Sequence, residues 1–383
     1  MKRCSIVRFL LIVFVCLYGV IQANSTGASD LTDKRMLGRL IFFDTRLSSP
    51  DGQACVSCHD PQFGFSDPDQ DIPVSGGVMP LRVGSRNAPT VTYLATAPDF
   101  AQVDPLDPLA KAGFIGGQFW DSRASNLFEQ AKLPFLNALE MHNPNKYAVV
   151  HDVEKGSYAD LFKKVYGKDV FYNINYAYDS IADAIVAFEK SPELNKFNSK
   201  YDLFLQGKVQ LTDQEADGLA LFEGKGNCFR CHVTTPNSEN GPPVFTSFKF
   251  ASIGVPRNPS NPFYSLIPSL NPDGYGFIDD GLGGFLRSIG APSAVYGPQL
   301  GKMNFPTIRN IALTAPYFHN GVFSDLKTVV HFFNTRDVPG SGFAPPEAPL
   351  ENISAITGNL GLTDAEEDAI VAFMETLTDD YSP

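Results

Sequence analysis

The sequence predicts a mostly α-helical fold made of two similar halves, with long irregular loops between the helices. Three observations lead to this prediction. The pattern C-x-x-C-H occurs twice, at residues 55–59 and again at residues 228–232. An apolar segment with helical spacing precedes each pattern, and another apolar helical segment closes each half. The chain has 383 residues, 43% hydrophobic and 19% charged, so it can form two globular units with ordinary cores.

The N-terminus has the pattern of an export signal. Basic side chains come first, residues 9–21 are almost wholly apolar, and Ala23 is a small residue at a plausible cleavage point. We therefore expect residues 1–23 to be a signal peptide for export to the periplasm, with a retained anchor as the alternative. These residues hold three basic and no acidic side chains, so their removal takes the net charge from −12 to −15. Such an acidic chain is not expected to bind nucleic acid, and it favours a basic or dipolar protein partner.

All four cysteines outside the signal segment lie in the two C-x-x-C-H patterns. The first contains Cys55, Cys58 and His59, and the second contains Cys228, Cys231 and His232. Two thiols at this spacing add to the vinyl groups of haem, and the adjacent histidine reaches the iron as its proximal ligand. Two disulfides, a zinc site or a redox dithiol are the alternatives, but none of them needs a histidine after each of two pairs. The sequence therefore predicts two covalently bound haem c groups.

The helices around these motifs repeat as well. Residues 37–43 and 218–222 carry apolar side chains at helical spacing before the two motifs, and Thr212 opens a capping-box pattern before the second. The sequence AIVAF occurs at residues 184–188 and again at residues 369–373. Each half therefore follows the plan of a cytochrome c domain: a helix, a haem loop, a long excursion and a closing helix.

Long segments without a helical pattern connect these elements. Residues 60–118 and 233–308 are dense in Pro, Gly, Asn and Asp, which is typical of turns. Ordered loops of this length are often functional, and a buried haem gives them a surface to pack against. We expect two cytochrome c-like domains, over residues 24–195 (the first half) and 196–383 (the second half).

Further motifs then show a resemblance to a known family. They are FFDTRLS at 42–48, DPQFGF at 60–65, RNAPT at 86–90, FWDSR at 119–123, FPTIRN at 305–310 and LTAPYFHNG at 313–321. Together with the haem motifs, they resemble the bacterial di-haem cytochrome c peroxidases and the MauG-type enzymes, which oxidise residues of a partner protein. The resemblance implies that the N-terminal haem is the peroxide site and the C-terminal haem takes up electrons.

The resemblance also implies a catalytic pair above the first haem. His59 and His232 match the proximal ligands, and Gln130 and Glu140 match the distal pair. Cleavage of peroxide requires a proton to move from one oxygen to the other, and a buried carboxyl above the iron could carry it. Without a haem nearby, Glu140 would be a surface charge and Gln130 a solvated helix residue.

Two more roles follow from the resemblance. Trp120, the single tryptophan, matches an electron relay between the haems, and the alternative is a core aromatic residue. Asn87, Thr314 and Pro316 match the ligands of a calcium ion, and their oxygen atoms suit a hard cation. The alternative for these three residues is an ordinary loop and turn.

The sequence departs from the family pattern at both sixth-ligand positions. Many members have a histidine in the loop before the RNAPT motif, but residues 60–118 contain none, and Met79 stands in that register. We therefore expect the first haem to be permanently open, as in MauG-type enzymes. Family members bind the iron of the second haem with a methionine or a tyrosine as the sixth ligand. The matching position in this chain is Phe333, which cannot bind iron. Met303 and His331 are the candidates in its place.

Three functions remain open at this point. The leading one is reduction of hydrogen peroxide to water, with electrons from a small cytochrome c or a cupredoxin passing through the second haem and Trp120. The second is a MauG-like oxidation of Trp or Tyr residues in a partner protein. The third is a non-enzymatic di-haem electron carrier, which would leave Glu140 and Gln130 without a role. The resemblance also allows for a homodimer.

Overall fold

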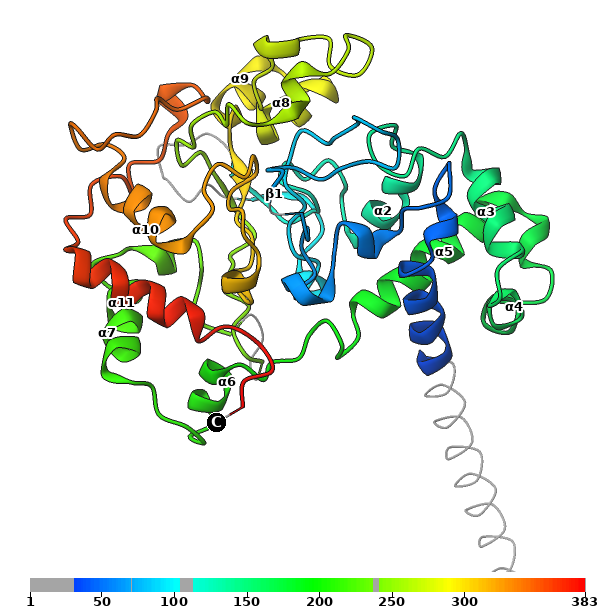
Figure 1. Cartoon of the computed structure of the whole chain (residues 1–383), viewed down its shortest axis with the longest axis horizontal. Helices are drawn as coiled ribbons and strands as arrows, with labels where there is room; N and C mark the ends of the chain where they lie inside the picture. The colour runs from blue at the N-terminus through cyan, green and yellow to red at the C-terminus, as the bar shows by residue number, and fades with distance from the viewer. Residues whose placement is uncertain (1–30, 70, 104–112, 237–240, 383) are drawn as a thin grey trace, which may run out of the picture.

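The computed structural model describes residues 31–69, 71–103, 113–236 and 241–382, and its fold is mostly helical, as predicted (Figure 1). The segment predicted to be a signal peptide, residues 1–23, lies outside the described residues. Among the helices in these ranges, none combines the length and the apolar character that crossing a bilayer would require.

The first half is organised by two helices that cross at a glycine. A helix over residues 31–42 packs against α5, and a Cβ at Gly38 would lie only 1.9 Å from the Ala184 carbonyl oxygen. The labelled helices of this half are α2 (Leu127–Lys132), α3 (Lys146–Glu154), α4 (Ala159–Tyr166) and α5 (Ile174–Glu189). An asparagine side chain caps the N-termini of α2, α3 and α5 by accepting a backbone N–H bond.

The second half repeats this crossing. A Cβ at Gly218 of α7 would lie 1.9 Å from the carbonyl oxygen of Ala369 in α11, as at the Gly38 crossing. The helices are α6 (Lys200–Leu205), α7 (Asp213–Glu223), α8 (Gly281–Ser288), α9 (Ser293–Tyr296), α10 (Leu326–Thr335) and α11 (Asp364–Glu375). The predicted capping box at Thr212 is confirmed, and a second one opens α11. The repeat seen in the sequence is therefore present in three dimensions.

The long excursions are mostly loops and single 3-10 turns, as expected, with two short sheets. The antiparallel pairs are β1 (Ala101–Val103) with β2 (Gly113–Ile115), and β3 (Phe250–Ala251) with β4 (Met303–Asn304). The excursion over residues 233–308 also contains α8 and α9, which were not predicted. Their apolar faces pack with Phe114 and Phe250, so these two helices are stabilised by contacts with distant segments.

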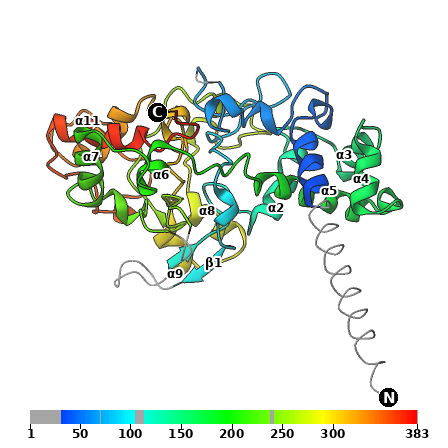
Figure 2. The same cartoon turned by 90° about the horizontal axis from the view of Figure 1, so that it is seen from below.

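Two large apolar clusters form the core. One is built from residues between Leu37 and Leu194, and the other from residues between Tyr201 and Leu377. Figure 2 shows the helices of the two clusters, α3 to α5 and α7 with α11, at opposite ends of the molecule. The clusters fall within the two predicted halves, while the domain boundary itself stays a prediction.

A buried cation connects the two halves. The Arg309 side chain is fully buried and donates to both carboxylate oxygens of Asp202, at 2.9 and 2.8 Å. Its guanidinium also lies over the rings of Tyr93 and Phe197, at 4.8 and 4.6 Å from their centroids. Tyr93 belongs to the first half and in turn donates its hydroxyl to Asp379 near the C-terminus. This cluster therefore fixes the position of one half against the other.

Candidate haem sites

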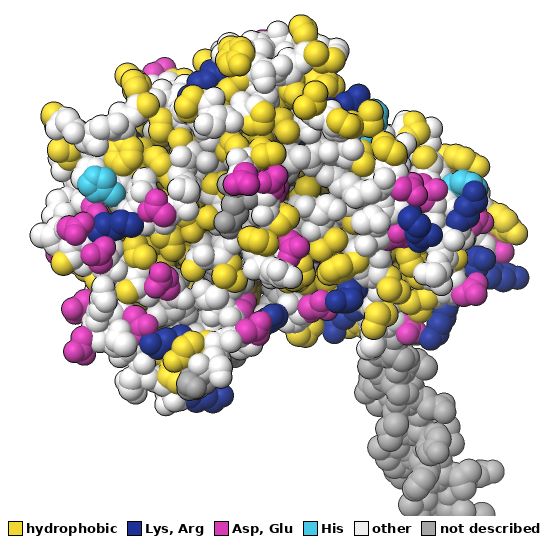
Figure 3. All heavy atoms as spheres, in the orientation of Figure 1, with side chains coloured by type: hydrophobic (Ala, Val, Ile, Leu, Met, Phe, Trp, Pro, Cys, Tyr) yellow, Lys and Arg dark blue, Asp and Glu magenta, His cyan; other side chains and the backbone are white. Residues whose placement is uncertain are grey.

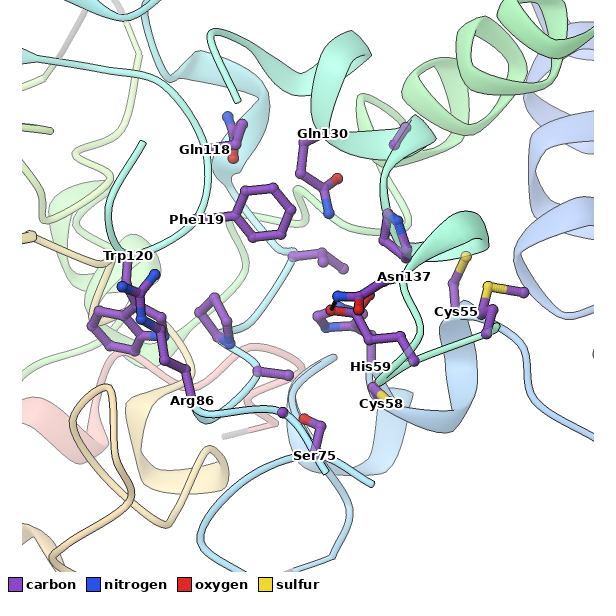
Figure 4. Close-up of a pocket in the computed structure, with 18 of the residues that line it drawn as sticks. Cys55, Cys58, His59, Ser75, Arg86, Gln118, Phe119, Trp120, Gln130 and Asn137 are labelled. Carbon is purple, nitrogen blue, oxygen red and sulfur yellow. Dashed lines mark hydrogen bonds between the residues drawn. The ribbon is translucent and has the colours of Figure 1, made fainter. Parts of the chain in front are cut away.

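The first C-x-x-C-H motif opens into a cavity of about 430 Å³. Cys55, Cys58 and His59 line one side of it, and Gln130 and Glu140 line it as well. In Figure 4, Gln130 lies across the cavity from Cys58 and His59. The structure therefore brings together the predicted attachment residues and the predicted distal pair of the first haem.

The two motif histidines are oriented in the same way. The Nδ1 atom of His59 lies 3.2 Å from the Phe65 carbonyl oxygen, and that of His232 lies 3.1 Å from the Phe245 carbonyl oxygen. A carbonyl oxygen only accepts, so Nδ1 carries the proton and Nε2 keeps a free lone pair, as in a metal-binding histidine. Burial lowers the pKa of His59 to about 4 and lowers the pKa of His232, so both rings are neutral at pH 7. Each histidine is therefore prepared to bind iron through Nε2.

The second motif lines a narrower cavity of about 160 Å³, together with mostly apolar side chains. Its cysteines, like those of the first motif, do not form a disulfide, so all four sulfur atoms are free to form thioether bonds. Free thiols, an oriented imidazole and apolar walls are what a covalently attached haem requires at both cavities. The residues present therefore fit two haem c groups.

Glu140 is in a setting suited to proton transfer. Its Oε1 accepts a hydrogen bond from the Asn137 amide at 2.7 Å. Burial raises the pKa of Glu140, while the Arg123 guanidinium and the Asn137 hydrogen bond act in the opposite direction. A buried carboxyl whose pKa is raised above its usual value can both take up and release a proton during turnover.

The loop that carries Met79 does not supply a ligand to this cavity. Met79 is absent from the cavity lining, and the loop is held against the distal segment by a 3.0 Å bond from the Val78 N–H to the Glu140 carbonyl. His59 is the only histidine among the described residues that line the cavity. Met141, the one methionine of this lining, belongs to the apolar core of the first half.

Trp120 lines both cavities and is thus the physical connection between them. Its indole N–H donates to the Asn87 carbonyl at 2.9 Å, and its ring packs against His319 at a centroid distance of 6.3 Å. Two backbone hydrogen bonds support this pair, and each connects one half of the chain to the other. The Asn87 N–H donates to the His319 carbonyl at 2.7 Å, and the Asn304 N–H donates to the Trp120 carbonyl at 2.8 Å.

Trp120 and His319 occupy equivalent positions of the two halves. Each follows a phenylalanine with a positive φ, Phe119 at 70° and Phe318 at 67°. An antiparallel bridge closes each turn, between Gln118 and Ala124 and between Tyr317 and Phe323. His319 was not recognised from the sequence, although aligning FWDSR with YFHNG would have placed it opposite Trp120. It lines the second cavity.

The predicted calcium ligands are brought together only in part. The Asn87 amide nitrogen donates to the Pro316 carbonyl at 2.5 Å, and Thr314 lies two residues earlier with its hydroxyl donating to the Ile311 carbonyl. A cation would need the amide oxygen of Asn87, rather than its nitrogen, on this side. The calcium site therefore stays a prediction.

The two candidates for the second haem's sixth ligand are placed differently. Met303 lines the second cavity, as does Phe333. His331 lies on another face of α10: its side chain is 46% exposed, and its Nδ1 is 2.9 Å from Glu367 Oε1. His331 therefore does not reach the second haem site, because two residues of helix turn it away from the Phe333 face.

The fold and the two sites define a di-haem c-type cytochrome. The sequence profile of the di-haem cytochrome c peroxidase family, which also covers MauG, matches residues 32–210. The methylamine utilization protein MauG of Paracoccus denitrificans is 34% identical over 358 residues, covering 90% of this chain and 88% of the relative. The cytochrome c551 peroxidase of Nitrosomonas europaea is 32% identical over 363 residues, covering 94% and 84%.

A solved structure agrees with these relatives. The di-haem peroxidase BthA from Burkholderia thailandensis superposes with a TM-score of 0.80 at 29% identity, over 91% of this chain and 86% of BthA. The chain belongs to the di-haem cytochrome c peroxidase family. It is therefore a di-haem oxidoreductase of the peroxidase class, with two haem c groups.

Proposed function

We propose that this protein reduces hydrogen peroxide to two molecules of water at the first haem site, using two protons and two electrons from a small cytochrome c or cupredoxin. The observation that carries the proposal is the position of Trp120, which lines both cavities while Glu140 and Gln130 line only the first. Electrons taken up at the second site would reach the peroxide site through this residue.

The distal side chains divide the work at the first site. The haem, when bound, supplies the redox chemistry of O–O bond cleavage. Glu140 takes a proton from one peroxide oxygen and returns it to the other, which becomes the leaving water. Gln130 offers an amide N–H to hold the peroxide in place without changing its charge. Asn137 keeps the Glu140 carboxyl oriented through its 2.7 Å hydrogen bond.

The first site is proposed to react without prior reduction. The support is the cavity lining, in which His59 is the only described histidine and the Met79 loop is bonded to the Glu140 segment. A haem held by Cys55, Cys58 and His59 would leave the part of the cavity lined by Gln130 and Glu140 to peroxide.

The proposal also includes the domain organisation, the location and the calcium ion expected from the sequence. The chain would fold as two cytochrome c-like domains, be exported to the periplasm by residues 1–23, and bind one calcium ion between the halves near Asn87 and Pro316. The negative charge of the chain suits a cationic donor, whose association would slow as salt is added. Figure 3 shows acidic and basic side chains interspersed on one face, without a large basic patch there.

A MauG-like oxidation of Trp or Tyr residues in a partner protein is the second candidate. The specific observation in its favour is the same open first site, together with the 34% identity to MauG of Paracoccus denitrificans. Electrons would then leave the partner and pass through Trp120 in the same direction, with the partner itself as the reductant. A non-enzymatic carrier is disfavoured because it gives no role to Glu140.

The experiment that tests the proposal compares two Glu→Gln variants of the haem-loaded protein. Glu140→Gln should slow the reaction of the first haem with peroxide by roughly 10²- to 10⁴-fold, the usual range for a lost acid–base group. Glu129→Gln is the matched control: Glu129 lies one residue from Gln130, pairs with Lys132 at 2.7 Å and is 46% exposed. Stopped-flow absorbance after mixing with peroxide gives the rate.

The choice between the two enzymatic functions then depends on the reductant. Fast peroxide-dependent oxidation of reduced cytochrome c or cupredoxin supports the peroxidase. An oxidised intermediate that persists with these donors but decays when one partner protein is added supports the MauG-like function. A wild-type protein that does not react with peroxide contradicts both.

A further inference from the structure

The two cavities differ in the helix that forms one wall of each. Helices α2 and α10 occupy equivalent positions of the two halves. Each follows the turn closed by an antiparallel bridge, after Trp120 or after His319, and each begins at a capping side chain, Asn126 or Asp325. Four residues after its cap, α2 places Gln130 in the first cavity and α10 places Val329 in the second. The position that offers an amide to one site therefore offers only methyl groups to the other.

The whole contribution of α10 to the second cavity is apolar. The α10 side chains that line it are Leu326, Val329, Val330 and Phe333. None of them has a nitrogen, oxygen or sulfur atom that could bind iron, and Phe333 lies one helical turn beyond the Gln130-equivalent position. This wall supplies neither a ligand to iron nor a hydrogen bond to a molecule bound there.

Met303, the candidate with a sulfur atom, comes from another wall. It stands three residues before Pro306, whose carbonyl, like that of Phe245, faces the His232 ring. The same relation holds in the first cavity between Arg86 and Pro89, whose carbonyl faces His59. The Pro306 end of the segment that carries Met303 therefore lies on the histidine side of the cavity, whereas a sixth ligand must approach from the opposite side.

The other lining residues with donor atoms include Tyr317, His319, Met374 and Thr357, and the buried Thr357 hydroxyl has no hydrogen-bond partner among the described residues. The Tyr317 hydroxyl donates to the Ile311 carbonyl at 3.0 Å, and the His319 ring packs on Trp120. Met374 belongs to α11 and packs in the apolar cluster that α11 forms with α7. None of these side chains is part of the α10 wall.

We propose that the second haem has an open, apolar sixth position that binds small uncharged ligands of the carbon monoxide and nitric oxide type when the iron is reduced. This inference rests on the two haem sites of the proposed function but not on peroxide turnover. An anion would face methyl groups and a phenyl ring on the α10 wall, and the unpartnered Thr357 hydroxyl elsewhere in the lining carries no charge. Binding an anion there costs free energy, whereas a neutral diatomic molecule has no such requirement. Peroxide and fluoride are therefore directed to the first site, where Gln130 and Glu140 can bind them.

The test is a titration of the fully reduced, haem-loaded protein with carbon monoxide, followed by absorbance and scored as molecules bound per chain. The wild-type protein should bind two, one at each haem, and its oxidised form should show two high-spin sites by electron paramagnetic resonance and bind one fluoride. Phe333→Met places a thioether on the α10 wall, so this variant should bind one carbon monoxide and show one low-spin site. Met303→Leu is the matched control and should still bind two.

Two results would overturn the inference. One carbon monoxide per wild-type chain, or a low-spin site in the oxidised wild-type protein, means that a side chain occupies a sixth position. A rise from one to two in Met303→Leu would identify Met303 as that side chain. Failure of the peroxidase proposal would show up instead in the Glu140→Gln kinetics, which leave the carbon monoxide count unchanged.

Discussion

Glu189 is a buried carboxyl group of the first half, and it lines the first cavity. It is the last residue of α5, it is 4% exposed, and its Oε2 has no hydrogen-bond partner among the described residues. Burial raises its pKa from 4.5 to about 8. Glu189 follows Phe188 as Met374 follows Phe373, and these two phenylalanines pack at the Gly38 and Gly218 crossings, so the equivalent position of the second half holds an uncharged side chain.

The consequence for stability follows from the two pKa values. The folded protein holds the Glu189 proton more tightly than the unfolded chain, so this contribution is fully present below about pH 4.5 and is lost as the pH rises through about 8. At about 1.4 kcal/mol for each pKa unit, ionisation of Glu189 lowers the free energy of unfolding by up to about 5 kcal/mol. Glu189→Gln keeps the shape of the protonated acid and cannot ionise, so it should remove most of that decline.

The assay is denaturant unfolding of the haem-loaded protein, followed by circular dichroism at intervals between about pH 5 and pH 9. The wild-type curve should fall relative to the Glu189→Gln curve as the pH rises. Glu193→Gln is the control, since Glu193 pairs with Arg39 at 3.0 Å and is 41% exposed. Parallel pH curves for the wild type and Glu189→Gln would refute the assignment of a buried, neutral carboxyl.

Three further substitutions test other parts of the structure. Trp120→Phe should slow electron transfer from the second haem to the first by roughly tenfold or more, measured by rapid mixing, and leave the initial reaction with peroxide unchanged. Asp202→Asn should lower the free energy of unfolding by about 3–5 kcal/mol, seen as a lower denaturant midpoint, because Arg309 would stay buried without its counter-charge. Gly218→Ala should cost about 1–3 kcal/mol or more in thermal unfolding, because the new Cβ would lie 1.9 Å from the Ala369 carbonyl.

Local sequence patterns predicted the parts of the fold that depend on neighbouring residues. The capping box at Thr212 and the helices around both AIVAF segments are confirmed. Each of these features is determined within one or two helical turns, so no knowledge of the rest of the chain is needed. The same is true of the haem motifs, whose cysteines and histidine are close in sequence as well as in space.

The features that sequence patterns missed depend on distant contacts. Helices α8 and α9 lie in a segment rich in Gly and Pro and are stabilised by packing against Phe114 and Phe250. His319 becomes meaningful only once its ring is seen against Trp120. His331 is a candidate iron ligand by residue type, but the orientation of α10 directs it to Glu367 and the solvent.

The backbone hydrogen bonds around Trp120 and His319 have a consequence for which substitutions such a protein can accept. Asn87 of the first half supports His319 of the second, and Asn304 supports Trp120, in both cases through backbone atoms. Substitution of a side chain does not remove a backbone N–H or carbonyl, except by proline. The backbone support of Trp120 and His319 can therefore persist while the side chains that line the two cavities differ, with polar groups such as Gln130 and Glu140 in one and mostly apolar groups in the other.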